Sequence, residues 1–197
     1  MIGVTGGIAT GKTAVLARLS EHGAAIIDGD RVYHDLIAPG GPLVPSLVAA
    51  FGDGVRAADG SIDRRALGSV VFSDPTMLAR LDTITHPAIV AEIRDRIARA
   101  DVEVVAIDAV KLVESGLDED CDAVWLVQAD RAVQKQRLMD RNGLDAIAAD
   151  RRLDAQPTFD SARALANEVI DNSGTLSELR AQVDNAWNRF LLSATPA

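Results

Sequence analysis

A phosphate-loop pattern near the start of the chain constrains the fold more than any other feature. Gly6 to Thr13 reads Gly-Gly-Ile-Ala-Thr-Gly-Lys-Thr and matches G-x-x-x-x-G-K-[ST]. The apolar run Met1–Thr5 before it predicts a strand, and the amphipathic stretch Thr13–Glu21 after it predicts a helix ending at Gly23. A glycine-rich turn between a strand and a helix directs backbone N–H groups inward at the positive end of the helix dipole. This turn is therefore an anion site.

Each fixed position of the pattern has a chemical reason. Glycine at positions 6 and 11 allows a tight backbone path and the close approach of phosphate oxygens. Lys12 reaches the β- and γ-phosphates, and the hydroxyl of Thr13 is a ligand for Mg²⁺. The sequence therefore predicts that a nucleoside triphosphate binds along the loop. The residues expected to contact it are Gly6, Gly7, Ile8, Ala9, Thr10, Gly11, Lys12, Thr13 and Ala14.

Charge and composition narrow the class of partner. The chain of 197 residues carries 20 basic and 29 acidic side chains, a net charge of −9, so its surface repels nucleic acid and anionic membranes. Its single cysteine, Cys121, forms no internal disulfide. No apolar run approaches the ~18 residues of a membrane span, and no signal peptide is recognisable. We expect a cytoplasmic protein with small-molecule partners, no nucleic acid and no membrane; no oligomeric state is predicted.

Short β-rich apolar runs alternate with helical patterns along the chain. Near-continuous apolar runs are typical of strands that helices cover on both faces, and the polar residues that follow them lie where open α/β sheets bind ligands. One helix is expected from Asp130 to Arg141, and the last from Thr175 or Ser177. We predict a three-layer α/β/α P-loop NTPase fold with a five-stranded parallel sheet. The predicted strands are Met1–Thr5, Ala24–Ile27, Val102–Ile107, Ala123–Val127 and Glu168–Ile170.

Two stretches depart from this alternation. Residues 39–100 hold amphipathic helical segments and no central strand, and predict a helical insertion that binds the acceptor. Residues 142–159 are polar and predict a small lid. The expected organisation is one kinase domain over residues 1–197, with a core formed by residues 1–38, 101–141 and 160–191.

A phosphate loop alone does not say what receives the phosphate. A GTPase switch would carry Asn-Lys-x-Asp, and none of Lys12, Lys111 and Lys135 follows an asparagine. A motor ATPase usually needs more chain for its coupling domains. A small chain with a helical insertion and an arginine-bearing lid indicates a kinase of the nucleoside-kinase type, in which the lid closes over the γ-phosphate and excludes water.

Two carboxylates follow the second predicted strand, in Ile27-Asp28-Gly29-Asp30. We expect them beside the phosphate loop, in a right-handed βαβ unit. A carboxylate can orient an acceptor hydroxyl and take its proton as the bond to phosphorus forms. Asp30 also precedes a helical segment, and aspartate is a favoured N-cap residue. Position alone leaves capping and catalysis open for Asp30.

With these features, the chain resembles the dephospho-coenzyme A kinase family. The resemblance covers nearly the whole chain in the family's order and approximate spacing. Its most specific parts are the early Ile-Asp-x-Asp, the Asp-Arg and the His-Pro. The segments that carry it are 5–13, 27–30, 58–67, 71–72, 86–87, 112–114 and 169–174.

The resemblance implies transfer of phosphate from ATP to the ribose 3′-hydroxyl of dephospho-coenzyme A, giving coenzyme A and ADP, with ATP and Mg²⁺ as cofactors. It implies that Asp30 is the catalytic base and that Asp28 is either a supporting carboxylate at the acceptor or one linked to Mg²⁺. Two alternatives stay open: another P-loop kinase for a nucleoside, nucleotide or other small molecule, and a non-catalytic ATP-binding protein. Lys111 favours the second alternative, because it stands where the family has an apolar residue.

Arginines are suited to gripping phosphate. Arg64 matches the family's Asp-Arg position and is expected to contact the acceptor or a phosphate. Arg137 and Arg141 are four residues apart on one helix face and lead into the lid, where they could neutralise the transferring phosphoryl group. A solvated helix face is the alternative. The resemblance favours Arg137 for catalysis, together with Lys12 and Asp30, and Arg141 for substrate binding.

Three further residues complete the expected site. Asp108 ends an apolar strand, as a carboxylate that organises Mg²⁺ would, so Thr13 and Asp108 are the expected metal ligands. His86 is expected to line the acceptor pocket, or else to begin a helix before Pro87. Ala9 stands where the family usually has glycine, and the loop tolerates alanine there if its φ is negative.

Overall fold

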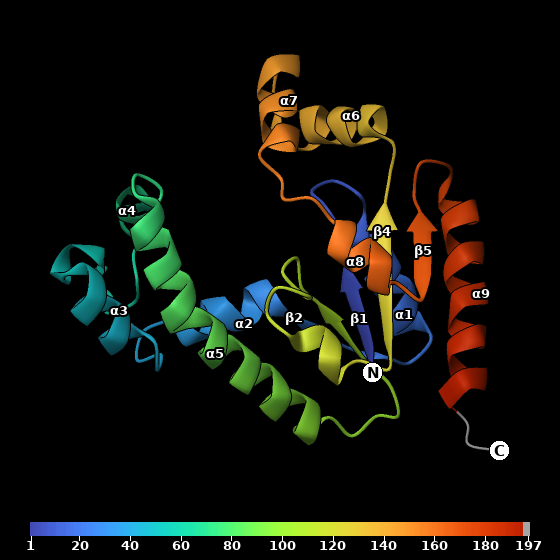
Figure 1. The fold of residues 1–197 in the computed structure, drawn as a ribbon, viewed down its shortest axis with the longest axis horizontal. Helices are drawn as coiled ribbons and strands as arrows, with labels where there is room; N and C mark the ends of the chain where they lie inside the picture. The colour runs from blue at the N-terminus through green and yellow to red at the C-terminus, as the bar shows by residue number, and fades with distance from the viewer. Residues whose placement is uncertain (195–197) are drawn as a thin grey trace. The chain divides into compact units, whose positions relative to one another are not determined.

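The computed structural model describes residues 1–194 in two units (Figure 1). The first unit holds residues 1–26 and the chain from residue 101 onward, and the second holds residues 27–100. Within residues 1–194, no helix is both long and apolar enough to cross a membrane. The division into core, acceptor-binding insertion and lid stays a prediction.

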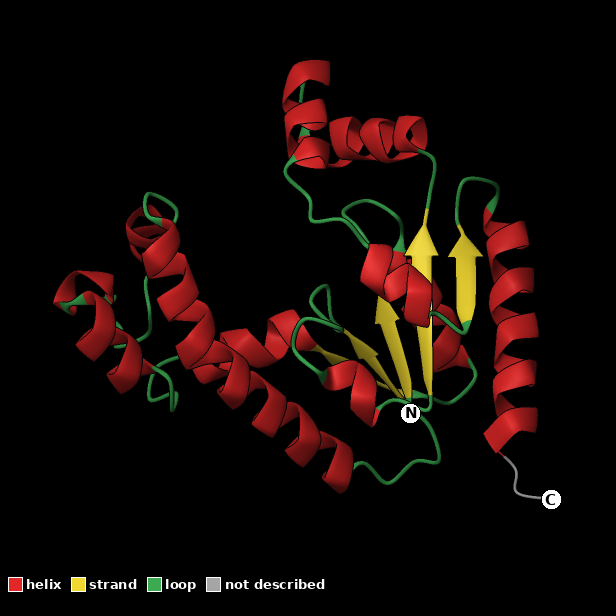
Figure 2. Cartoon of the chain, viewed as in Figure 1, coloured by secondary structure: helices red, strands yellow, loops and turns green. Residues whose placement is uncertain are grey.

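A five-stranded sheet organises the first unit, drawn in yellow in Figure 2. The strand order is β2-β3-β1-β4-β5, and β1 pairs in parallel with β3 and β4, as β4 does with β5. The predicted five-stranded parallel sheet is confirmed. The strands are β1 (Ile2–Thr5), β2 (Ala25–Asp28), β3 (Val105–Asp108), β4 (Ala123–Gln128) and β5 (Glu168–Asp171).

The second strand does not lie beside the first, because β3 lies between them. Burial explains the order. Val105 to Ile107 of β3 are buried, whereas β2 is only partly buried at the edge of the sheet. The most apolar runs therefore occupy the centre of the sheet, and the connection through the first helix skips one strand position.

Alternate residues of the strands pack into the two neighbouring layers. Ile2, Val4 and Trp125 belong to a buried cluster with side chains of α1 and α9. On the opposite face, Gly3 packs so closely that a Cβ there would lie 2.6 Å from Leu112 Cδ2, and α8 covers β4 (Figure 1). The helices of this unit are α1 (Lys12–Glu21), α6 (Arg131–Asn142), α7 (Ala146–Asp154), α8 (Asp160–Leu165) and α9 (Leu176–Ala194), with a 3-10 turn η2 (Leu117–Asp120).

Local signals set two of the predicted helix ends. Gly23, with φ +96°, follows the end of α1 and takes the left-handed backbone conformation that glycine favours. At the start of α9, Thr175 Oγ1 accepts from the Glu178 amide at 3.2 Å, and Glu178 Oε2 accepts from the Thr175 amide at 2.7 Å. This reciprocal capping box confirms a helix that begins at Thr175.

Helices α6 and α7 form a small core of their own. Leu138, Ala149 and Leu153 are buried together between them. Lys135 Nζ lies 2.6 Å from Asp150 Oδ2 and ties the two helices at the surface. Half of the segment predicted as a lid is therefore a helix, α7, that packs on α6.

The second unit is helical, with one isolated antiparallel bridge between Arg56 and Ile62. The long helix α5 contacts α2, α3 and α4, and Ile93 at its centre is fully buried. His86 and Pro87 lie inside α5, so the expectation that His86 begins a helix is wrong. The helices are α2 (Gly29–Leu36), α3 (Val44–Phe51), α4 (Arg64–Val71) and α5 (Pro75–Arg99), with a 3-10 turn η1 (Asp53–Val55).

Candidate active site

The phosphate loop runs from the end of β1 at Thr5 to the start of α1 at Lys12. Gly6 has φ +150° and Gly11 has φ +94°, conformations that side chains disfavour. A Cβ at Gly6 would lie 2.2 Å from the Val127 carbonyl oxygen, and a Cβ at Gly11 would lie 2.0 Å from Asn172 Nδ2. Both glycines are therefore required by the backbone path and by close neighbours.

Gly11 is also the N-cap of α1, and no side chain of the described residues caps its first amides. The first N–H groups of a helix lack partners within the helix and carry the positive end of its dipole. Residues Gly11 to Thr13 thus present backbone donors suited to an anion, whereas the Ala14 amide donates to the Gly11 carbonyl oxygen at 2.9 Å.

Lys12 crosses the loop, and its Nζ donates to the Gly6 carbonyl oxygen at 2.9 Å. The same Nζ lies 4.0 Å from Asp108 Oδ1 at the carboxyl end of β3. Thr13, the next residue of α1, is exposed. The structure therefore brings together the lysine and the strand-end carboxylate predicted for the site.

Ala9 is the one residue other than glycine with a positive φ, +59°, among those the structure describes. The negative φ set as the condition for tolerating alanine there is not found. The left-handed conformation costs an L-residue roughly 1–2 kcal/mol. Ala9 and its neighbour Ile8 pack against the α6–α7 core, and this packing holds the side chain in place.

Arg137 of α6 holds the loop from its carbonyl side. Its Nη1 donates to the carbonyl oxygens of Ala9 and Thr10, each at 3.3 Å, and its Nη2 donates to the Asn172 carbonyl oxygen at 2.8 Å. Asn172 is buried, and its Nδ2 donates to the Thr10 carbonyl oxygen at 2.8 Å. For Arg137, the alternative of a solvated helix face is wrong.

Arg141 differs from its predicted partner. It is exposed, and its Nε donates to Asn142 Oδ1 at 3.1 Å rather than to the loop. One of the two predicted lid arginines therefore contacts the phosphate loop, and the other lies at the surface.

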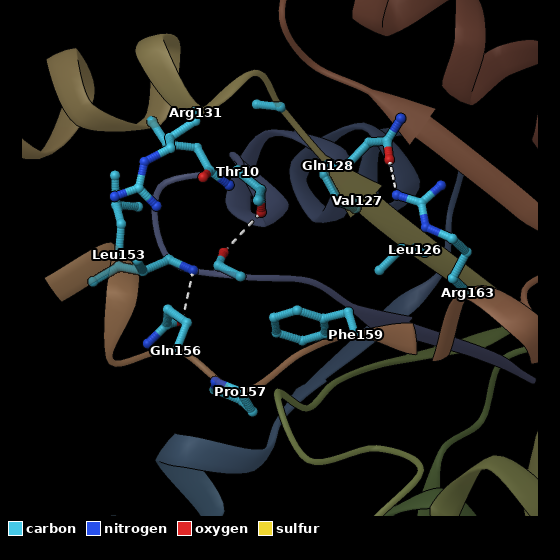
Figure 3. Close-up of a pocket in the computed structure, with 14 residues that line it drawn as sticks. Thr10, Leu126, Val127, Gln128, Arg131, Leu153, Gln156, Pro157, Phe159 and Arg163 are labelled. Carbon is cyan, nitrogen blue, oxygen red and sulfur yellow. Dashed lines mark hydrogen bonds between the residues drawn. The ribbon is translucent and has the colours of Figure 1, made fainter. Parts of the chain in front are cut away.

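A cavity of about 240 Å³ lies on the Gly7–Ile8 side of the loop (Figure 3). Gln156, between α7 and α8, accepts a hydrogen bond from the Ile8 amide through Oε1 at 3.0 Å. None of the lining residues is acidic. They are Gly7, Ile8, Thr10, Leu126, Val127, Gln128, Ala129, Arg131, Gln134, Leu153, Gln156, Pro157, Phe159 and Arg163.

Sequence reasoning missed Gln156 and Phe159 as neighbours of the loop. A Cβ at Gly7 would lie 3.3 Å from Phe159 Cε2, so the ring lies directly over the loop. Both residues follow a polar segment without periodicity, and no local pattern links them to positions 7 and 8.

In the second unit, Asp28 and Asp30 have different roles in helix α2. Asp28 is the N-cap, and its Oδ1 accepts from the amides of Asp30 at 2.9 Å and Arg31 at 3.1 Å. The capping alternative for Asp30 is therefore wrong, because the N-cap is Asp28 and the helix begins two residues earlier than that alternative requires. The Asp30 carboxylate is exposed in the first turn and makes no hydrogen bond or ion pair with residues 1–194.

Arg64 and His86 occupy helix positions in the same unit. Arg64 is the exposed first residue of α4, whose N-cap is Asp63. Burial raises the pKa of Tyr33, and the nearby charge of Arg64 opposes that rise. His86 Nε2 lies 3.5 Å from Asp82 Oδ1, one turn earlier on α5.

Comparison with known proteins indicates the family of this chain. The family model described as Dephospho-CoA kinase matches residues 1–178. A dephospho-CoA kinase of Symbiobacterium thermophilum is 45% identical over 190 residues, covering 95% of this chain and 80% of that protein. One from Geobacter sulfurreducens is 43% identical over 190 residues, covering 95% and 96%.

A solved structure shares the fold over nearly the whole chain. The crystal structure of TT1252 from Thermus thermophilus superposes with a TM-score of 0.80 at 29% identity, covering 99% of this chain and 97% of that one. The match thus extends over the phosphate loop, the helical second unit and the α6–α7 segment. The chain belongs to the dephospho-CoA kinase family, P-loop kinases that perform the last step of coenzyme A synthesis.

Proposed function

We propose that this chain transfers the γ-phosphoryl group of ATP to the ribose 3′-hydroxyl of dephospho-coenzyme A, releasing coenzyme A and ADP. Family membership supports dephospho-coenzyme A as the acceptor substrate. The observation that carries the proposal is the phosphate loop, which has backbone donors at the start of α1 and Lys12 held across its mouth 4.0 Å from Asp108. Such an arrangement suits a triphosphate rather than a neutral ligand.

The nucleotide's phosphates would lie along Gly6 to Ala14, with Lys12 shared between the β- and γ-phosphates. Lys12 donates to a loop carbonyl here, so phosphate oxygens would replace a modest hydrogen bond with charge-assisted ones. Arg137 holds the loop carbonyls and stands ready to bear charge that develops on the transferring group. Arg141, exposed on the same helix, is proposed to contact substrate.

Thr13 and Asp108 fit a magnesium ion. Mg²⁺ prefers oxygen ligands and keeps several waters, so it needs only one or two protein groups besides phosphate. No group of three potential metal-binding side chains occurs within residues 1–194, which agrees with a metal completed by substrate and water. Bound there, Mg²⁺ would neutralise phosphate charge.

On the acceptor side, we assign the base to Asp30. The hydroxyl proton passes to its carboxylate as the oxygen–phosphorus bond forms and the bond to ADP breaks. The assignment is supported by the exposure of the Asp30 carboxylate, which does not cap helix α2. Asp28 would fix the turn that presents Asp30, and Arg64 and His86 would contact the acceptor.

The domain roles follow from the same proposal. Residues 39–100 would bind the acceptor, and residues 142–159 would close over the phosphates as a lid. We place the activity in the cytoplasm, where ATP is available.

A substrate panel tests the proposal. The chain is incubated with Mg²⁺ and ATP, and ADP release is followed with dephospho-coenzyme A, shikimate, gluconate, adenosine and AMP. Dephospho-coenzyme A should be preferred at least ~10²-fold in kcat/KM, because a site built to bind a substrate's polar groups rejects analogues that lack them. Mass and NMR analysis should place the new phosphate on the 3′-oxygen. Equal turnover of another alcohol, or ATP binding without product, would reject the assignment.

A further inference from the structure

The cavity beside the phosphate loop has a composition unlike the rest of the chain. The protein carries 29 acidic residues, yet none of the residues lining this cavity is acidic. Its polar wall is formed by backbone of the loop and by arginine and glutamine side chains. Such a wall donates hydrogen bonds, and its Arg131 is ion-paired with Asp150 and Asp154, which do not line the cavity. All the lining residues belong to the first unit.

Gln156 connects this cavity to the loop through a bond of defined direction. The Ile8 amide is a donor, so the atom that faces it must be the carbonyl oxygen Oε1, 3.0 Å away. The other atom of the planar side-chain amide, Nε2, is therefore turned away from Ile8. Among residues 1–194, no acceptor takes a hydrogen bond from Nε2.

This bond polarises the side chain in a useful sense. Hydrogen-bonded groups in series strengthen one another, so an Ile8 N–H that donates to Oε1 makes Nε2 a better donor. The Ile8 amide thus strengthens Nε2 of Gln156 as a hydrogen-bond donor at the edge of the loop. The carbonyl oxygen of the same Gly7–Ile8 peptide accepts from Thr10 Oγ1 at 2.9 Å, so this peptide is held from both sides.

We propose that Gln156 is a positioning residue for the transferred phosphoryl group: Oε1 fixes the Gly7–Ile8 peptide, and Nε2 donates to an oxygen of the nucleotide's γ-phosphate. This inference rests on the proposed function for the identity of the nucleotide. It assigns a role in discriminating triphosphate from diphosphate to a residue outside the phosphate-loop motif.

The test measures binding of ADP and of the non-hydrolysable analogue AMP-PNP, each with Mg²⁺, by calorimetry. Gln156→Glu keeps an oxygen for the Ile8 amide but replaces the Nε2 donor with negative charge. The affinity for AMP-PNP should fall ~10–100-fold, because like charges are brought together. The affinity for ADP, which lacks the γ-phosphate, should change less than about threefold because screening weakens the more distant interaction.

A matched control is available in α9. Gln182 Oε1 accepts from the Asp171 amide, also at 3.0 Å, and lies outside the cavity. Gln182→Glu makes the same chemical change. It also removes the bond from Nε2 to the Asp171 carbonyl oxygen at 2.8 Å, but it should leave the ratio of AMP-PNP to ADP affinity unchanged. Gln156→Met, which adds no charge, should lower that ratio ~3–10-fold through loss of one hydrogen bond to a charged group.

The outcomes separate the two proposals. Equal weakening of ADP and AMP-PNP in Gln156→Glu would make Gln156 a structural support for the loop, and unchanged binding of both would remove it from the site. Either result overturns the inference. Because neither measurement needs an acceptor, a wild-type protein that fails to phosphorylate dephospho-coenzyme A would contradict the proposed function alone.

Discussion

The two units hold their candidate residues in opposite ways. In the first unit, Lys12 and Arg137 bond to carbonyl oxygens of the phosphate loop, which links the nucleotide side of the site to the packed core. In the second unit, the side chains of Asp30 and Arg64 are exposed and make no hydrogen bond or ion pair with residues 1–194. Folding itself therefore organises the proposed nucleotide side, whereas the proposed acceptor side keeps its polar groups exposed to water.

This difference predicts that substitutions in the second unit alter turnover alone. Asp30→Asn should lower kcat by ~10²–10⁴ because the proton acceptor is lost, while ADP affinity and the unfolding midpoint stay unchanged. Steady-state kinetics and calorimetry check both parts. Asp53→Asn, an exposed aspartate of the same unit, is the control and should retain full activity. Near-normal turnover in Asp30→Asn would remove the base from the mechanism.

Substitutions in the first unit should damage binding and turnover together. Lys12→Ala removes the cation that spans the loop and should lower kcat ~10²–10³-fold, with weaker binding of both ADP and AMP-PNP. The same assays check it. Lys111→Ala, at an exposed lysine outside the loop, should bind nucleotide normally. If Lys12→Ala lost turnover but bound nucleotide as well as wild type, the contrast between the units would fail.

Stability should separate the two arginines of α6. Arg137→Gln removes charge-assisted hydrogen bonds to three carbonyl oxygens and should lower the free energy of unfolding by ~1.5–3 kcal/mol. Arg141→Gln, at the surface, should change it by less than about 0.5 kcal/mol. Urea titrations of both variants measure the difference. Equal losses would mean that the Arg137 contacts do not support the loop.

The smallest effect is expected at Ala9. Ala9→Gly removes the strain of the left-handed conformation, but it raises the entropy of the unfolded chain and loses a methyl contact. The free energy of unfolding should therefore change by less than about 1 kcal/mol. Ala9→Val places a β-branched side chain at φ +59° and should cost ~1–3 kcal/mol. Thermal unfolding distinguishes the pair. A stable valine variant would show that the loop adopts another path in that protein.

Local patterns made most of the fold predictable. The strands, the glycine-rich turn and the helix beginning at Thr175 each depend on residues close together in sequence, and the structure confirms them. The phosphate loop could be placed for the same reason, since its glycines, lysine and helix start are adjacent.

Long-range packing explains what could not be predicted. The position of β3 between β1 and β2 depends on the relative burial of runs almost 80 residues apart. The contact of Gln156 with Ile8 spans 148 positions, and the positive φ of Ala9 depends on a core built by α6 and α7. His86 was misplaced because a proline usually marks a helix start, whereas α5 continues through Pro87.

A crystal structure with Mg²⁺, AMP-PNP and dephospho-coenzyme A would test the central claim most directly. The account predicts triphosphate oxygens on the amides of Gly11 to Thr13 and on Lys12 Nζ, with the acceptor's 3′-oxygen within hydrogen-bond distance of the Asp30 carboxylate. Nucleotide bound away from the loop, or an acceptor whose 3′-oxygen lies far from Asp30 with both ligands in place, would contradict it.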